Sequence, residues 1–150
     1  MIDETVAICR YIEEAHPEPA LMGTDPTHQA QVEMRQRHME WDGLIPAMEV
    51  FRNSFPGFSS RGLGGNVGEV AAIPEMVERG KSSLLRFYDS LDAYLADNEF
   101  VAGDTFSIAD ITALCTIDFA GGAARVPIPD TCTHVQRWHE AVSSRTSAKA

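Results

Sequence analysis

Apolar side chains recur at three- and four-residue intervals in five stretches of this 150-residue chain, the spacing that puts them on one face of an α-helix. The stretches lie at residues 4–16, 27–55, 74–97, 107–121 and after Pro129. No stretch alternates steadily between apolar and polar residues, and no Asn-Gly or Asp-Gly turn separates two β-branched runs. The sequence therefore predicts an all-α fold of five or six helices.

Prolines and glycines mark where the helices break. Residues 17–26 hold three prolines and one glycine, so we expect a linker there. Thr27 can cap the second helix, and Pro46 predicts a kink inside it. Residues 56–73 hold five glycines and predict a mobile loop between two long helices. These glycines do not follow the G-x-G-x-x-G pattern of a nucleotide-binding loop.

The clearest local signal comes before the fourth stretch. Ser107 is followed three residues later by Asp110, which is the pattern of a capping box. Phe106 and Ile111 flank the pair and complete a hydrophobic staple. In such a box the hydroxyl and the carboxylate each accept an N–H that the first helical turn leaves unpaired. The helix that follows is apolar on most sides and ends near Gly121, so we expect it to be buried at the centre of the fold.

The charge balance narrows the range of partners. The formal net charge is −10 and no run of Lys and Arg interrupts it, which disfavours binding to nucleic acid or to an anionic membrane surface. The longest apolar stretch, residues 108–124, contains two aspartates and is too short to span a bilayer. The acidic N-terminus differs from the start of a secretory signal. We therefore expect a cytoplasmic protein with no nucleic-acid or membrane partner.

The cysteines and histidines point to structural rather than chemical roles. Cys9, Cys115 and Cys132 are odd in number and lie far apart among apolar neighbours, so we expect buried thiols in a reducing compartment. His134 and His139 lie about 140° apart around a helix, so they cannot share a metal ion on one face. No metal site is expected.

Glu4 and Thr5 begin the first helix and permit two interpretations. A helix N-terminus offers unpaired N–H groups and partial positive charge to a carboxylate. The Thr5 hydroxyl adds a donor and Glu4 supplies an anion for an ammonium group, so the pair suits the α-amino acid end of a ligand. The alternative is ordinary capping of the helix by Asp3 or Thr5.

Several segments resemble a known family. Residues 4–13 are similar to the Glu-Ser-x-Ala-Ile-x-x-Tyr-Leu helix that closes the glutathione site in cytosolic glutathione S-transferases. Residues 100–111 resemble the loop and capping box that lead into the buried central helix of that family. Residues 134–138 and 144–147 resemble its closing helix, with Thr146 in place of the usual proline. The chain is thus identified as a member of the cytosolic glutathione S-transferase family.

The resemblance implies a division of the chain. Residues 1–16 correspond to the last helix of a thioredoxin-like domain, residues 17–26 to the linker and residues 27–150 to the complete all-α C-terminal domain. The strands of the first domain, and the Ser, Tyr or Cys that activates the glutathione thiol, have no counterpart here. We therefore expect a fragment of a longer protein, because Ile8 and Ile12 would otherwise be exposed. We expect no catalytic residue in this chain and no activity from it alone.

The resemblance also implies roles for particular residues. Glutathione is the expected substrate, and Glu4 and Thr5 bind its γ-glutamyl end. A small hydrophobic electrophile is the expected second substrate, and a homodimer is expected to form through the first helix and the long second one. The wall of the electrophile pocket is assigned to His38, Trp41, Asp42 and Ile45.

Two alternatives remain open. His38 and Asp42 can instead form a solvated pair across one helical turn, and Trp41 can be a core residue. The whole domain can also be a non-catalytic protein-interaction module, as in some relatives. An activating Ser, Tyr or Cys ahead of this sequence would discriminate between a module and an enzyme.

Overall fold

The structure, a computed structural model, describes residues 1–65 and 67–149. Asn66, in the predicted glycine-rich loop, and Ala150, the last residue of the predicted helical domain, lie outside the described residues. The described residues form helices and loops with two isolated β-bridges, which confirms the all-α prediction. Within them, no helix combines the length and the apolar character needed to cross a bilayer.

The helices follow the predicted order. The α-helices are α1 (Thr5–Ala15), α2 (Pro26–His38), α3 (Ile45–Ser54), α4 (Pro74–Leu95), α5 (Ile108–Gly122) and α6 (Thr133–Ser143). A π-helix, η1 (Met39–Leu44), joins α2 to α3, and short 3₁₀ turns, η2 (Pro56–Phe58) and η3 (Thr146–Lys149), follow α3 and α6.

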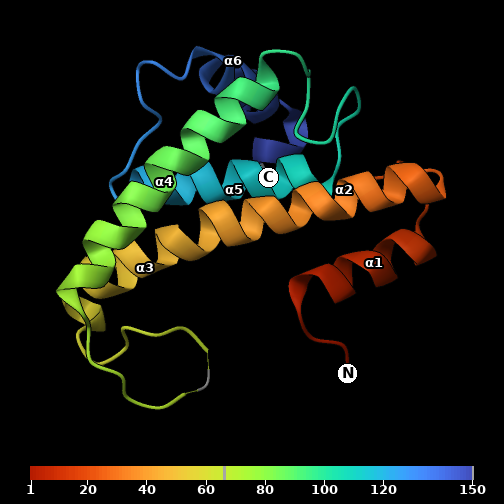
Figure 1. Ribbon diagram of the computed structural model, residues 1–150. Helices are drawn as coiled ribbons and strands as arrows, with labels where there is room; N and C mark the ends of the chain where they lie inside the picture. The colour runs from red at the N-terminus through yellow and green to blue at the C-terminus, as the bar shows by residue number, and fades with distance from the viewer. Residues whose placement is uncertain (66, 150) are drawn as a thin grey trace.

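One long rod organises the bundle. Figure 1 shows α2, η1 and α3 running end to end, with α4 crossing them at an angle. Helix α5 contacts α2, η1, α3 and α6, so it lies among the other helices, and α6 also contacts α4. Helix α1 lies beside α2 and outside this bundle, and none of its residues is buried.

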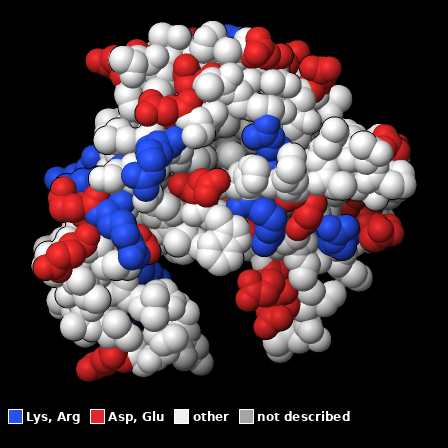
Figure 2. All heavy atoms as spheres, in the orientation of Figure 1, with Lys and Arg blue, Asp and Glu red and all other residues white. Residues whose placement is uncertain are grey.

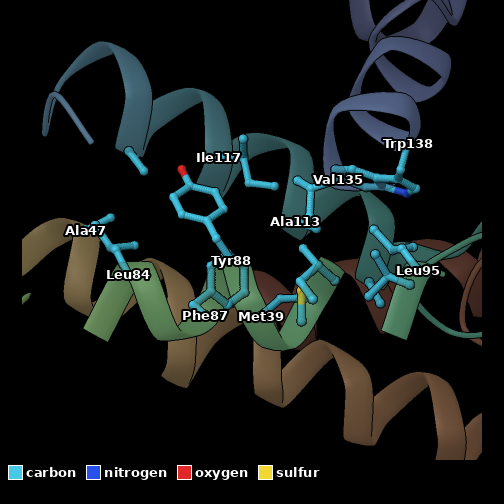
Figure 3. Close-up of a cluster of buried hydrophobic side chains, with 14 of the residues drawn as sticks. Met39, Ala47, Leu84, Phe87, Tyr88, Leu95, Ala113, Ile117, Val135 and Trp138 are labelled. Carbon is cyan, nitrogen blue, oxygen red and sulfur yellow. The ribbon is translucent and has the colours of Figure 1, made fainter. Parts of the chain in front are cut away.

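The core lies between the α2–η1–α3 rod and helices α4, α5 and α6 (Figure 3). Leu84 and Tyr88 of α4 are fully buried, and Figure 3 shows the Tyr88 ring rising toward α5 near Ile117 and Leu84 lying near Ala47. The Tyr88 hydroxyl donates to Val126 O at 3.0 Å, and its burial raises the pKa of Tyr88 to about 12. Trp138 closes the other end of the core from α6. Each fully buried large side chain contributes about 1.5–3 kcal/mol to folding.

The central position of α5 is confirmed, since it is buried on most sides. Its buried residues are Ile108, Ala109, Asp110, Ala113, Thr116, Ile117 and Ala120.

Two glycines allow the rod to approach its neighbours closely. A Cβ atom at Gly43 would lie 2.9 Å from both the Phe87 ring and Thr116 Cγ2. A Cβ atom at Gly80 of α4 would lie 2.7 Å from Val50 Cγ2 of α3. Because such separations are shorter than carbon atoms tolerate, only glycine fits at these two crossings.

The start of α2 differs from the prediction that Thr27 caps it. Asp25 is the N-cap residue, and its carboxylate accepts the N–H groups of Thr27 at 2.9 Å and of His28 at 3.1 Å. Pro26 occupies the first helical position, where its fixed φ and missing N–H suit the helix. Thr27 is therefore already inside the helix and cannot cap it.

A π-helix precedes Pro46, the residue at which the sequence predicts a kink. Pro46 has no N–H to donate to Asp42 O, four residues back, so the regular α-helical pattern is interrupted there. The wider turn of η1 lies just ahead of this gap and continues into α3. The side chains on either side of η1 therefore do not keep the relative directions of one unbroken α-helix.

The glycine-rich loop connects α3 to α4 as predicted, and backbone hydrogen bonds close its base. Gly62 N–H donates to Val70 O at 2.9 Å, and Val70 N–H donates to Ser60 O at 3.0 Å. The Arg52 guanidinium of α3 donates to Arg61 O at 3.1 Å. The mobility of this loop stays a prediction.

Candidate functional site

The N-terminal end of α1 carries the two residues predicted to bind glutathione. Glu4 is the N-cap residue, with φ 68° and ψ 128°, and its side chain accepts no N–H of the first turn. A positive φ costs a residue other than glycine about 1–3 kcal/mol, and such strain is concentrated at binding sites. Neither Asp3 nor Thr5 caps the helix, so the alternative interpretation does not hold. The first-turn N–H groups are left available to an anion.

A cavity of about 320 Å³ lies next to this helix end, between α1 and α5; we call it the α1–α5 cavity. Its α1 wall includes Thr5, Cys9 and Ile12, and its α5 wall includes Ile108 and Ile111. Ile12 is 51% exposed and Ile111 is 39% exposed, so the mouth of the cavity is an open apolar surface. Thr5 therefore stands between the polar helix end and an apolar surface.

A second cavity, of about 400 Å³, lies between the rod and α4; we call it the α2–α4 cavity. It brings together three of the four residues predicted to form the electrophile pocket: His38, Trp41 and Asp42. Ile45 is half-buried and is absent from the described lining of this cavity. Trp41 is 64% exposed, so the alternative that it is a core residue is wrong.

The α2–α4 cavity carries polar as well as apolar groups. Arg35 and Arg86 line it from opposite helices, and Phe87 forms part of its floor. The Arg35 guanidinium stacks over the Tyr94 ring with its Cζ 3.3 Å from the ring centre. Figure 2 shows Lys and Arg side chains interspersed with Asp and Glu over the face formed by α2 and α4. A ligand here would meet both an aromatic surface and positive charge.

Ser107 and Asp110 form the predicted capping box, and Asp110 also accepts hydrogen bonds from residues outside the box. Asp110 Oδ2 accepts Ser107 N–H at 2.9 Å, and Ser107 Oγ accepts Ala109 N–H at 3.3 Å. Asp110 Oδ1 accepts Val101 N–H and Trp138 Nε1–H, each at 2.9 Å. Burial raises the pKa of the Asp110 carboxyl, although these hydrogen bonds act to lower it. This buried carboxylate thus joins three separate segments of the chain.

The cysteines differ from one another in exposure. Cys132 is buried and Cys9 is half-buried, but Cys115 is exposed, so the prediction of three buried thiols is wrong for Cys115. Helix α5 presents Cys115 on its one exposed side, together with Ile111. Burial raises the pKa of the Cys132 thiol, the opposite of what a reactive thiolate requires.

The described residues contain no group of three His, Cys, Asp or Glu side chains that could hold a metal ion. His139 Nε2 instead lies 2.7 Å from Asp118 Oδ1.

Comparison with known proteins relates this geometry to a family. A family model described as "Glutathione S-transferase, C-terminal domain" matches residues 49–146. The chain belongs to the glutathione S-transferase family. The predicted family and the predicted type of helical fold are therefore both confirmed.

The glutathione S-transferase relatives extend the match to nearly the whole chain. Glutathione S-transferase 2 of Saccharomyces cerevisiae is 30% identical over 149 residues, which is 99% of this chain and 61% of that protein. The crystal structure of Gtt2 from S. cerevisiae matches with a TM-score of 0.87 and 26% identity, over 99% of this chain and 68% of that one. The crystal structure of a glutathione S-transferase of class Gtt2 from Vibrio parahaemolyticus matches with a TM-score of 0.80 and 35% identity, over 97% of this chain and 64% of that one. The chain thus spans about three fifths of the yeast relative.

Two contacts near the candidate site have no signal in the sequence pattern. One is the bond from Trp138 to Asp110, across 28 residues. The other is a pair of hydrogen bonds from the backbone of Leu21 and Met22 to the Glu13 carboxylate. Both depend on how segments pack against each other rather than on local spacing.

Proposed function

We propose that this chain is the helical, electrophile-binding part of a glutathione S-transferase. The observation that carries the proposal is the extent of the likeness to the yeast relative, which takes in α1 as well as the helical bundle. In this proposal residues 1–16 are the last helix of a thioredoxin-like domain, residues 17–26 the linker and residues 27–150 the C-terminal domain. The compartment is the cytoplasm, where the free cysteines remain reduced.

The reaction joins the glutathione sulfur to an electrophilic carbon. The thiol loses its proton, the sulfur forms the new bond, and the electrophile loses a leaving group or accepts the electron pair. Glu4 holds the ammonium of the γ-glutamyl end, while Thr5 and the first-turn N–H groups of α1 hold its carboxylate. The strained φ of Glu4 and the absence of a side-chain cap support this assignment.

The apolar part of the electrophile is assigned to the α2–α4 cavity. The exposed ring of Trp41 offers it a flat apolar surface, and His38 and Asp42 offer polar contacts beside that ring. Ile45 directly precedes Pro46, which lines the cavity.

A homodimer through α1 and the rod completes the proposal. This part of the proposal rests on the family resemblance, because the exposed side chains of Ile8 and Ile12 on α1 are assigned to contact with the thioredoxin-like domain.

A conjugation assay tests this function. The 150-residue chain should show no glutathione-dependent turnover, because a free thiol is only a few per cent thiolate at neutral pH and α1 binds the far end of the molecule. The same chain joined to a thioredoxin-like domain of the family, placed ahead of Met1, should be active. In that protein Glu4→Ala should raise KM for glutathione by about tenfold or more and change kcat much less. Asp3→Ala, at the neighbouring exposed acid, is the matched control.

Two results would contradict the proposal. Turnover by the 150-residue chain alone would mean that the thiol-activating group lies within it. A joined protein that folds but neither turns over nor binds glutathione would favour the protein-interaction module instead.

A further inference from the structure

The Glu13 carboxylate ties α1 to the chain that follows it. Glu13 Oε2 accepts Leu21 N–H at 2.9 Å, and Glu13 Oε1 accepts Met22 N–H at 2.8 Å. Glu13 lies in the last turn of α1, whereas Leu21 and Met22 lie beyond the proline-rich part of the linker. We call this pair of hydrogen bonds the Glu13 fork. Hydrogen bonds to a charged acceptor are about twice as strong as neutral ones, so the fork attaches α1 firmly to the linker.

Leu21 and Met22 are themselves fixed to the helical bundle. Leu21 O accepts the N–H of Ile108 at 2.9 Å, and Ile108 is the first residue of α5, whose N–H has no partner within its own helix. Met22 is buried in the core. The Glu13 fork therefore attaches α1 to a linker segment that is itself hydrogen-bonded to Ile108, the residue that follows the Ser107 cap of α5.

Few other contacts position α1. The ion pair between Arg10 and Glu33, at 3.3 Å, joins two exposed side chains and contributes little. Val6 and Cys9 pack against the core but are only half-buried. Among the described residues, the Glu13 hydrogen bonds are the polar contacts from α1 to the rest of the chain that are partly buried.

We propose that Glu13 is a positioning residue that fixes the orientation of α1, and so sets where Glu4 and Thr5 meet glutathione. The inference rests on the proposed binding role of that helix end. The helix runs about 13 Å from Glu13 back to Glu4, so a tilt of about 10° at Glu13 moves Glu4 by about 2 Å. Functional groups must be held within about 0.5 Å, so a tilt of this size takes Glu4 and Thr5 out of position.

Three variants separate this role from a general loss of stability. Glu13→Ala removes the fork. Glu13→Gln keeps an oxygen that can accept from both N–H groups but loses the charge and turns an NH₂ toward Met22 N, so it should restore the function in part. Glu14→Ala removes the neighbouring exposed carboxylate and is the matched control.

The first measurement uses the 150-residue chain and does not depend on glutathione. Residual dipolar couplings report whether α1 keeps its orientation relative to α2–α6. Glu13→Ala should make the α1 couplings disagree with a single rigid body, whereas Glu14→Ala should leave them as in the unchanged protein. Unchanged α1 couplings in Glu13→Ala would overturn the inference.

The second measurement uses the chain joined to a thioredoxin-like domain. If α1 is correctly oriented only a tenth of the time, the apparent KM for glutathione rises about tenfold, while bound glutathione selects the correct orientation and kcat changes less. Glu13→Ala should show this split, Glu13→Gln a smaller one and Glu14→Ala none. A raised KM in Glu4→Ala with no change in Glu13→Ala would overturn the positioning role alone. No change in either would refute the proposed binding role of α1 and this inference with it.

Discussion

Replacing Asp110 with alanine should lower the free energy of unfolding by about 3–5 kcal/mol, because it removes the one acceptor that several buried, neutral donors share. The substitution removes the acceptor of four buried donors: Val101 N–H, Ser107 N–H, Ser107 Oγ–H and Trp138 Nε1–H. Each such donor costs about 1–3 kcal/mol. Part of that sum is offset because the variant no longer buries a carboxylate, whose desolvation already raises the pKa of Asp110.

Urea denaturation followed by circular dichroism measures this change. The midpoint should fall with an unchanged slope, because the surface exposed on unfolding is nearly the same. Asp110→Asn keeps an oxygen for Val101 and Trp138 but turns an NH₂ toward Ser107 N–H, so its loss should be intermediate. Asp104→Ala, at an exposed acid in the preceding loop, should change stability by less than about 0.5 kcal/mol. A loss below about 1 kcal/mol in Asp110→Ala would refute the argument.

The pH dependence of the same variants gives a second check. Because the pKa of Asp110 is raised in the folded state, its stabilising contribution is complete below the unfolded pKa of about 3.9 and is lost as pH rises through the folded pKa. The stability difference between the unchanged protein and Asp110→Asn should therefore narrow from pH 4 to pH 7. A difference that widens over this range would contradict the assigned direction of the pKa.

Two further substitutions and one labelling experiment test the packing. Gly43→Ala should cost about 1–3 kcal/mol in thermal melts, because its Cβ meets the Phe87 ring at 2.9 Å. Gly122→Ala, where a Cβ meets nothing within 4 Å, should be neutral or stabilising, and an equal loss in both would refute the close crossing. A thiol reagent should modify the exposed Cys115 rapidly and the buried Cys132 only on unfolding. Equal rates for these two thiols in the folded protein would contradict their assigned burial.

The helices could be predicted from the sequence because their signals are local. The intervals between apolar residues place one face of each helix, and the Ser107 and Asp110 pair marks where α5 begins. The prediction that Thr27 caps α2 is wrong because Asp25 and Thr27 are both good capping residues. Pro26 decides between them, since proline suits the first helical position and so leaves Asp25 as the cap. The prediction that Cys115 is buried is wrong because the sequence of an almost uniformly apolar helix does not indicate which narrow side faces solvent.

The candidate site could be predicted only in part. His38, Trp41 and Asp42 lie within five residues of one another, so any helix brings them near the same surface. Ile45 lies beyond the π-helix, where the i→i+5 pattern shifts the direction of each side chain relative to an α-helix. The Glu13 fork depends on the path of the linker, which periodicity does not describe.

The glycine at the crossing of α3 and α4 also determines the alignment of the two helices. Gly80 is the position where α4 comes so close to Val50 and Pro46 O that no side chain fits. If α4 slid by one residue along α3, Arg79 or Lys81 would take that place and its Cβ would overlap the α3 backbone. A slide by a full turn would bring Met76 or Leu84 to the same point. The position of Gly80 therefore fixes the register of α4 on α3, because the two helices can pack closely in only one alignment.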